Sequence, residues 1–231
     1  AGDPATVLDQ LRAAAPAQPD RSAWLARIAA IKQDWKDNLQ SGEYSDAIPI
    51  RPERLCRDLS EVLPENAVLL VDTGHAAHWA CRHIHLDKPG QMLLRPAGSL
   101  GWSYPASLGA KCGVPDRPVV CFTGDGGFLY HLCEMETAVR YGINTVTVVN
   151  ANNSLNQERP AWDDNPAFDK DWRFAPVNYS EVAKSFGVRS WQVEKPADIA
   201  KAIKEALAAN APAVVEVLTD DQILAPGAWV P

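Results

Sequence analysis

Apolar runs of strand length alternate with stretches of helical character along most of the chain. The runs are rich in valine and other aliphatic residues and lie at 67–71, 118–122, 145–150, 191–193 and 213–217. The stretches around them have the length or the apolar spacing of helices, at 52–63, 106–112, 128–141, 179–186 and 197–209. Strands that alternate with helices are typical of parallel sheets, since the chain must cross back before each new strand. The pattern therefore predicts an α/β fold, a doubly wound parallel sheet with helices on both faces.

Two further helix-like stretches precede this pattern. Residues 1–17 contain a short segment with a few aliphatic residues, which is too small to bury its apolar face alone. Residues 22–40 repeat large apolar side chains every three or four positions, as an amphipathic helix does. A self-contained N-terminal helix and a segment that belongs to a larger body both remain open for residues 1–17.

The stretch from 119 to 157 is the most informative part of the chain. Its first apolar strand is followed at once by Gly124, Asp125, Gly126 and Gly127, and then by a helical stretch. Glycines let the backbone turn sharply and let a ligand come close. The N-terminus of the helix that follows favours an anion. This combination indicates a phosphate-binding turn.

Asp125 would repel a phosphate at this turn unless a cation lay between them. Mg²⁺ takes oxygen ligands and often uses only one or two protein side chains together with phosphate oxygens. The next strand brings Asn152 to the same sheet edge if the crossover is right-handed, and the Ser154 carbonyl could supply a third oxygen. We therefore expect a metal site at Asp125, Asn152 and Ser154. The alternative, an ordinary β-α-β unit with Asp125 as a helix N-cap, leaves the oxygen ligands at both strand ends unexplained.

Two loops upstream of this stretch carry further candidates. Gly74 follows the strand at 67–71 and fits a phosphate-approach loop, and His75 beside it is a candidate active-site residue. Residues 96–105 are mostly small, with one large aliphatic residue, Leu100, between two glycines. A plain turn before the next helix would also explain them. We do not assign a metal to the histidines that follow His75 on what we expect to be a loop without metal-type spacing: His78, His83 and His85.

The turn at 124–126 and the pair Asn152-Asn153 resemble the motif of a known family. It is the thiamine diphosphate (ThDP) enzymes of the acetolactate synthase and 2-oxoacid decarboxylase group, whose diphosphate-binding domain has a Gly-Asp-Gly turn and an Asn pair at similar spacing. The resemblance covers nearly the whole chain. It departs in one respect, because the family usually has two Asn directly after the strand and this chain reads Asn150-Ala151-Asn152-Asn153. Counting from the turn assigns the ligand to Asn152.

The resemblance implies a role for each candidate. Asp125, Asn152 and the Ser154 carbonyl would bind Mg²⁺. Leu100 matches an aliphatic wedge that keeps ThDP bent, and the Gly98 carbonyl matches an acceptor for its aminopyrimidine. With His75, these two are the catalytic candidates, because the bent cofactor acts as its own base and the protein supplies binding and orientation. The implied cofactor-binding residues are Gly74, His75, Ala76, Gly98, Leu100, Gly124, Asp125, Gly126, Gly127, Asn152, Ser154 and Leu155.

The resemblance also implies an activity and partners. We expect a ThDP- and Mg²⁺-dependent lyase or transferase that decarboxylates or carboligates a 2-oxoacid or a related carbonyl compound. A ThDP-dependent C–C hydrolase, an oxidase that also uses FAD, and a non-catalytic α/β subunit remain alternatives. The family's activating glutamate lies in a pyrimidine-binding domain that no segment here resembles. We therefore expect the active site at an interface with that domain or chain, in a homo-oligomer such as a dimer or tetramer.

By the same resemblance the chain divides into three parts. Residues 1–17 would be the tail of a preceding middle domain, 18–48 a linker helix and 49–231 the diphosphate-binding domain. Within the last part, residues 154–179 are rich in Asp, Asn, Pro and aromatic residues and predict a long irregular loop that could cover the site. The residues of this loop that we expect to face substrate are Leu155, Asn156, Gln157 and Trp162.

Composition further limits the classes of partner that the chain is expected to bind. The 231 residues carry a net charge of −7 and no Lys/Arg-rich run, which argues against nucleic acid or an anionic membrane as the main partner. The longest apolar runs have strand length, so we expect neither a transmembrane nor a secretory segment. The five cysteines are odd in number and lack metal-type pairing, which favours reduced thiols in a cytoplasmic protein.

Overall fold

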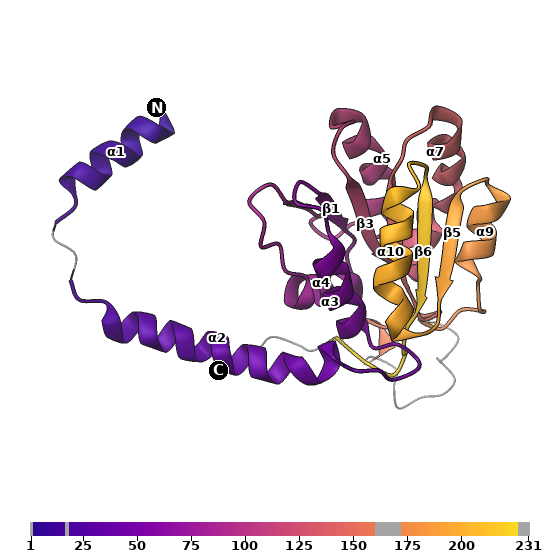
Figure 1. Cartoon of the computed structure of the whole chain (residues 1–231), viewed down its shortest axis with the longest axis horizontal. Coiled ribbons are helices and arrows are strands. Elements are labelled where there is room, and N and C mark those ends of the chain that lie inside the picture. Colours follow the sequence, from indigo (N-terminus) through magenta and orange to yellow (C-terminus); the bar gives the residue numbers. More distant parts are fainter. Residues whose placement is uncertain (1, 17–18, 160–171, 226–231) are drawn as a thin grey trace. The chain divides into compact units, whose positions relative to one another are not determined.

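The computed structural model describes residues 2–16, 19–159 and 172–225, and it divides the chain into two compact units, 1–38 and 39–230 (Figure 1). Helix α1 (Pro4–Ala14) and most of helix α2 (Ser22–Glu43) form the first unit. Asp3 caps α1 by accepting a hydrogen bond from the Thr6 N–H at 2.9 Å. All the described side chains of α1 are exposed, so its aliphatic residues have no partner among the described residues of this unit. No described helix combines the length and the apolar character needed to cross a membrane.

The second unit is built on a six-stranded sheet in which every neighbouring pair is parallel. The strand order is β2-β1-β3-β4-β6-β5. The bounds are β1 Val68–Val71, β2 Met92–Leu94, β3 Val119–Gly124, β4 Val146–Ala151, β5 Arg189–Val193 and β6 Ala213–Leu218. The predicted α/β fold with a doubly wound parallel sheet is confirmed.

Helices connect these strands. Their bounds are α3 Pro52–Val62, α4 His75–His83, α5 Ser103–Gly113, α6 Asp125–His131, α7 Met135–Tyr141, α9 Tyr179–Ser185 and α10 Ile199–Ala208, with short 3-10 turns η1 (Leu132–Glu134) and η4 (Pro196–Asp198). The single helix predicted over 128–141 is wrong in detail. His131 leaves the helical conformation, with φ −137° and ψ 18°, and η1 separates α6 from α7.

Two other elements differ from the prediction. The histidine-containing stretch expected to be a loop is helix α4, because Ala76, Ala77, Trp79 and Ala80 bury one helical face. Strand β2 was not predicted. Its side chains are all exposed, so it lacks the buried pattern by which the other strands are recognised.

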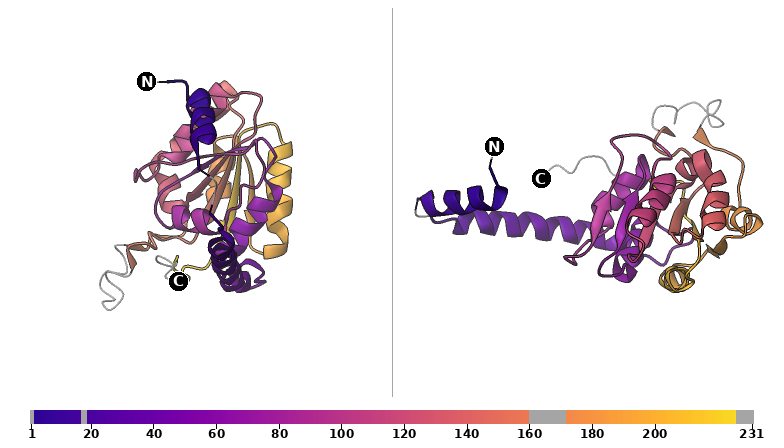
Figure 2. Two further views of the ribbon diagram at one scale, coloured as in Figure 1. Left: turned by 90° about the vertical axis from the view of Figure 1, so that its left-hand side faces the viewer. Right: turned by 90° about the horizontal axis from the view of Figure 1, so that it is seen from above.

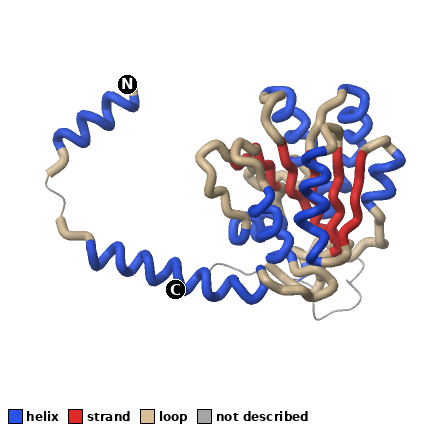
Figure 3. Tube along the Cα trace, in the orientation of Figure 1, coloured by secondary structure: helices blue, strands red, loops and turns tan. Residues whose placement is uncertain are grey.

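The sheet carries helices on both faces (Figures 2 and 3). One face packs against α3, α4 and α10, where buried side chains such as Leu59, Trp79 and Ile203 meet Phe122 of β3. The other face packs against α5, α6, α7 and α9, whose core includes Phe128. Consecutive residues of the central strands enter opposite cores, as the pleat requires.

The order in which successive strands are added to the sheet reverses between β1 and β3. From β1 the chain crosses through α4 to β2 on one side, and from β3 it crosses through α6 and α7 to β4 on the other. Ligands of open α/β sheets bind at such a switch point, outside the carboxyl ends of the strands. The loops after β1 and β3 are therefore brought to the place where the sequence predicts a site.

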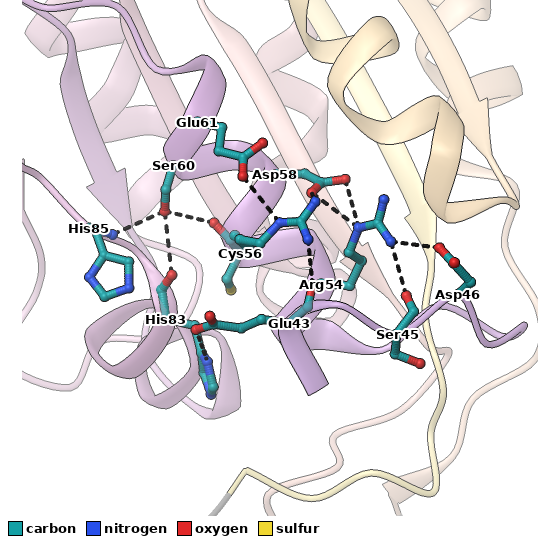
Figure 4. Close-up of polar contacts among 11 residues, drawn as sticks. Glu43, Ser45, Asp46, Arg54, Cys56, Asp58, Ser60, Glu61, His83 and His85 are labelled. Atoms are coloured by element: carbon teal, nitrogen blue, oxygen red, sulfur yellow. Dashed lines mark hydrogen bonds and ion pairs between the residues drawn. The ribbon is translucent and has the colours of Figure 1, made fainter. Parts of the chain in front are cut away.

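A polar network holds residues 43–46 against α3 and α4 (Figure 4). The Arg54 guanidinium donates to Asp58 at 3.0 and 3.1 Å and to Asp46 at 2.8 Å. The Nδ1 atom of buried His83, the last residue of α4, lies 2.9 Å from Glu43 Oε1. Because α4 follows directly after the β1 loop, this network holds α4 in place and with it the end of that loop.

Candidate functional site

A cavity of about 240 Å³ lies at the carboxyl ends of β1, β3 and β4. Every cofactor-binding residue predicted from the sequence lines it, from Gly74, His75 and Ala76 on one side to Ser154 and Leu155 on the other. The sheet thus gathers four separate stretches of sequence into one wall. The lining also includes residues that we did not assign to the cofactor: Thr73, Asn150, Asn156, Gln157 and Glu158.

Asp125 ties the ends of β3 and β4 together. It is 2% exposed, and its Oδ2 accepts hydrogen bonds from the backbone N–H groups of Asn152, at 2.7 Å, and Asn153. Its Oδ1 accepts from the Gly126 N–H at 2.8 Å. Burial raises the pKa of Asp125 to about 7, although these hydrogen bonds oppose the rise. Because Asp125 is the first helical residue and its carboxylate reaches across to β4, it is not a simple N-cap.

The two asparagines after β4 have different environments. Asn152 lines the cavity, and its Oδ1 accepts from the Ser154 N–H at 3.2 Å and the Ser154 hydroxyl at 2.8 Å. Asn153 has a positive φ of 54°, which asparagine tolerates, and its Oδ1 accepts from the Val177 N–H. Asn153 therefore holds the residues of the following loop in place, whereas Asn152 faces the cavity.

The glycines of the turn provide space, and the turn does not require a left-handed backbone. Gly124 begins the turn in an extended conformation with φ −78°. A Cβ at Gly126 would clash with Leu155, and one at Gly127 would lie 3.2 Å from Asp72 Cγ. A Cβ at Gly124 would meet no atom within 4 Å, because that position opens on the cavity. The backbone can thus approach a ligand without side chains in between.

Asp72 is a site residue that the sequence reasoning missed. It is fully buried at the end of β1, where Oδ1 accepts from the Gly101 N–H at 2.9 Å and Oδ2 from the N–H and hydroxyl of Ser103. It thereby holds the loop with Gly98 and Leu100 beside the cavity. An acidic residue directly after a buried strand is the signal that could have identified it.

His75 is the histidine that reaches the cavity. Its Nδ1 atom is buried and has no hydrogen-bond partner, and burial, followed by the neighbouring His78, lowers its pKa to about 4. His75 is therefore neutral at pH 7. His83 lies elsewhere on α4, against Glu43. Trp162, predicted to face substrate, lies outside the described residues.

The cavity fits a diphosphate with a divalent cation. Asp125 and Asn152 offer carboxylate and amide oxygens, which Mg²⁺ prefers, and the glycine turn leaves room for phosphate groups. Both lone pairs of the Asn152 amide oxygen are used by Ser154 in this structure. A metal at Asn152 would therefore require the Ser154 hydroxyl to rotate away, which is a change of one side-chain torsion.

Comparison with known proteins agrees with the fold and the cavity. Residues 72–217 match the family model of the thiamine pyrophosphate enzymes' C-terminal TPP-binding domain. The chain is 30% identical to the acetolactate synthase large subunit of Mycobacterium tuberculosis, over 90% of this chain and 38% of that protein. It is also 30% identical to the probable acetolactate synthase large subunit of Methanocaldococcus jannaschii, over 95% of this chain and 38% of that protein.

A relative from Methanococcus aeolicus, a probable acetolactate synthase large subunit, is 28% identical over 86% of this chain and 34% of its own length. The chain thus spans little more than a third of the length of these relatives. The matched region contains both Asp72 and the turn at Asp125, as well as the strand end at Asn152. The chain belongs to the thiamine pyrophosphate enzyme family, as its C-terminal TPP-binding domain, and it is similar to the corresponding part of acetolactate synthases.

Proposed function

We propose that this chain holds ThDP by its diphosphate through Mg²⁺, in an acetolactate synthase-like enzyme that decarboxylates or carboligates a 2-oxoacid or a related carbonyl compound. Such an enzyme would be a lyase or a transferase. The observation that supports this most directly is Asp125, a buried carboxyl group that joins two strand ends beside a glycine turn in the cavity. The names of the relatives favour this activity over hydrolysis or oxidation.

Each group of residues has its own task in this proposal. When bound, the cofactor would supply a nucleophilic carbon and an electron sink. Asp125, Asn152 and the Ser154 carbonyl would hold the cation. The backbones of Gly74, His75 and Ala76 and of the turn at 124–127 would surround the diphosphate.

The remaining predicted residues would shape the bound cofactor. Leu100 lines the cavity from a loop of small residues that Asp72 holds in place, which supports assigning it the task of bending the cofactor. The Gly98 carbonyl would accept from the cofactor's amino group. His75, neutral because of its lowered pKa, would contribute a hydrogen bond without adding charge.

We propose that the site is completed by a pyrimidine-binding domain or chain, in a homo-oligomer. The relatives are much longer than this chain, which leaves room for such a domain in the complete protein. The second unit also exposes an aromatic side chain near one of the cavity loops. Tyr130, 61% exposed, lies against Gly101 of the Leu100 loop, where a Cβ on Gly101 would be 2.7 Å from Tyr130 Cβ. Exposed aromatic residues are enriched where partners bind.

We also propose that the protein is cytoplasmic. All five cysteines are described and none is paired, with Cys56 and Cys121 buried. Burial raises the pKa of the Cys56 thiol, which keeps it protonated and unreactive. Unpaired thiols of this kind are typical of a reducing compartment.

The test of the proposed function is ThDP binding by the complete enzyme that contains this chain. Isothermal titration calorimetry with and without Mg²⁺ should show Mg²⁺-dependent binding, and Asp125→Ala should abolish it because the diphosphate loses its link to the protein. Asp116→Ala, a change at an exposed aspartate outside the cavity, is the matched control and should bind as the parent does. Unchanged ThDP affinity in Asp125→Ala would contradict the assignment.

A further inference from the structure

Strand β6 carries a fully buried glutamate. Glu216 is the charged residue of a strand whose other residues are all apolar, and it lies between Val149 of β4 and Gln192 of β5. A buried charge is costly unless hydrogen bonds compensate it. Packing alone would favour an aliphatic residue here, so the glutamate is explained by the groups that its carboxylate binds.

The Glu216 carboxylate holds the first turn of helix α9. Its Oε1 accepts a hydrogen bond from the Tyr179 N–H at 3.1 Å, and its Oε2 accepts one from the Ser180 N–H at 3.0 Å. The Gln192 side chain donates to the same Oε2 at 3.2 Å. The first N–H groups of a helix have no partner within the helix, and the helix dipole favours a negative charge beside them. Glu216 therefore fixes the start of α9 against β6.

Two contacts connect the start of α9 with the strand ends at the cavity. Val177, two residues before the helix, donates its N–H to Asn153 Oδ1 at 3.1 Å. The Tyr179 ring packs against Phe128 of α6, with the ring centroids 5.9 Å apart. Asn153 in turn donates its own N–H to Asp125. The start of α9 thus contacts the residues that follow both β3 and β4.

Asn153 depends on such contacts for its conformation. Its φ is 54°, a left-handed value that costs free energy for a residue other than glycine and persists where the surroundings hold it. Its carbonyl also accepts a hydrogen bond from the Phe174 N–H at 3.1 Å. Because Asn153 lies between Asn152 and Ser154, its backbone sets the direction in which both neighbours face.

We propose that Glu216 is a positioning residue of the cation site, acting through α9 and Asn153. This inference rests on the proposed function, because the cation belongs to the ThDP site. Glu216 is not among the described residues that line the cavity, so its effect on the cation is indirect. It holds α9, and α9 places the Val177 N–H against Asn153. Asn153 in turn presents Asn152 and the Ser154 carbonyl to Mg²⁺.

The experiment measures the affinity of the complete enzyme for Mg²⁺ at saturating ThDP, by isothermal titration calorimetry. Glu216→Gln replaces one acceptor oxygen by an amide donor that faces N–H groups, so Mg²⁺ should bind about tenfold more weakly. At saturating Mg²⁺ and ThDP, kcat should stay within about twofold of the parent value, because the bound cation restores the turn. Glu205→Gln, at a glutamate that joins α10 to Trp191 of β5, is the matched control and should bind Mg²⁺ as the parent does.

A double-mutant cycle tests the route through Asn153. Asn153→Gly removes the acceptor of the Val177 N–H and tolerates the positive φ, so it should weaken Mg²⁺ binding by a similar factor. If Glu216 acts through Asn153, the double variant binds Mg²⁺ about as weakly as either single variant. Two independent effects would multiply to about a hundredfold, and that result would overturn the inference.

Hydrogen exchange separates this inference from the proposed function. Without ThDP and Mg²⁺, the peptide that contains residues 150–155 should exchange about tenfold faster in Glu216→Gln than in the parent, because the turn opens more often. Failure of the parent to bind ThDP would defeat the proposed function, and this exchange would still decide whether Glu216 holds the turn. Unchanged exchange would overturn the inference, as would an unchanged Mg²⁺ affinity in Glu216→Gln.

A second variant keeps the test decisive if Glu216→Gln does not fold. Gln192 is exposed, and Gln192→Met removes its hydrogen bond to Glu216 while both hydrogen bonds to α9 remain. The affinity for Mg²⁺ should then fall by about threefold, because the carboxylate is held less firmly. An unchanged affinity in Gln192→Met would count against the inference in that case.

Discussion

At the scale of single residues, two buried carboxylates organise the loops around the cavity. Asp72 accepts backbone hydrogen bonds from the loop at Gly101, and Asp125 accepts them from Asn152 and Asn153. Each carboxylate stands at the end of one strand and fastens a loop that follows another. Charge-assisted hydrogen bonds of this kind are stronger than neutral ones. The loops around the cavity are therefore held in place by hydrogen bonds within the protein.

The role of Leu100 is tested by its truncation. Leu100→Ala should lower kcat by roughly tenfold to a hundredfold, because a cofactor held less firmly in its bent form is poorly aligned. Its affinity for ThDP should stay close to that of the parent, since the diphosphate contacts lie elsewhere in the cavity. Steady-state kinetics at saturating ThDP measure both effects. Leu25→Ala, at a 60% exposed leucine, is the control, and an unchanged kcat in Leu100→Ala would disprove the wedge role.

His83 should titrate below the usual range of histidine. Burial lowers its pKa from 6.5, whereas the hydrogen bond and charge of Glu43, with a smaller contribution from Glu53, oppose this and Arg82 adds to it. Since the folded pKa lies below the unfolded one, His83 contributes stability above pH 6.5 that is lost as the pH falls through the folded value. The neutral ring thus donates its Nδ1–H to the Glu43 carboxylate.

NMR titration of the His83 ring in Glu43→Gln checks this reading. The pKa of His83 should fall further, because the group that stabilises the charged ring is gone. Glu61→Gln, at a glutamate that pairs with Arg57, should leave it where it is in the parent. A rise in the pKa of His83 in Glu43→Gln would contradict this prediction, because it would mean that Glu43 does not stabilise the charged ring.

At the scale of elements, two arginines of α3 share one buried carboxylate. Asp58 is 2% exposed and accepts hydrogen bonds from both Arg54 and Arg57. Asp46 also binds Arg54, but its side chain is 85% exposed. The two aspartates share a partner and differ in burial, so they form a matched pair for mutation.

Asp58→Asn should destabilise α3 by about 3 kcal/mol, since it removes the buried charge that two partly buried guanidinium groups share. Asp46→Asn should change stability by less than about 1 kcal/mol, because exposed ion pairs contribute little. Hydrogen exchange of the α3 amides in the two variants measures the difference. Equal protection factors in the two variants would contradict the importance assigned to burial.

Most strands of the sheet could be predicted from the sequence. Strands β1, β3, β4 and β6 were found within one or two residues, because each is an apolar run buried on both faces. Strand β2 was missed because it is a short edge strand with exposed side chains. Helix α4 was missed because the histidines at 75, 78 and 83 obscured its apolar face.

At the scale of the whole molecule, topology brings distant residues into one cavity. The glycine turn, the asparagine pair and the small-residue loop could be found in the sequence because each carries a local signal. Asn150 could not, because its importance lies in facing the same space as Gly74 and His75. That relation depends on the strand order and on how the loop after β4 turns back.

The most direct test of the account is exchange of the C2 proton of ThDP, followed by NMR with this chain at saturating Mg²⁺. Circular dichroism first establishes that the purified chain is folded. We expect slow exchange with this chain alone, because the activating carboxylate would belong to a pyrimidine-binding partner. We expect fast exchange once that partner is added. Fast exchange with the chain alone would mean that a group within it activates the cofactor, and the two-part site would be contradicted.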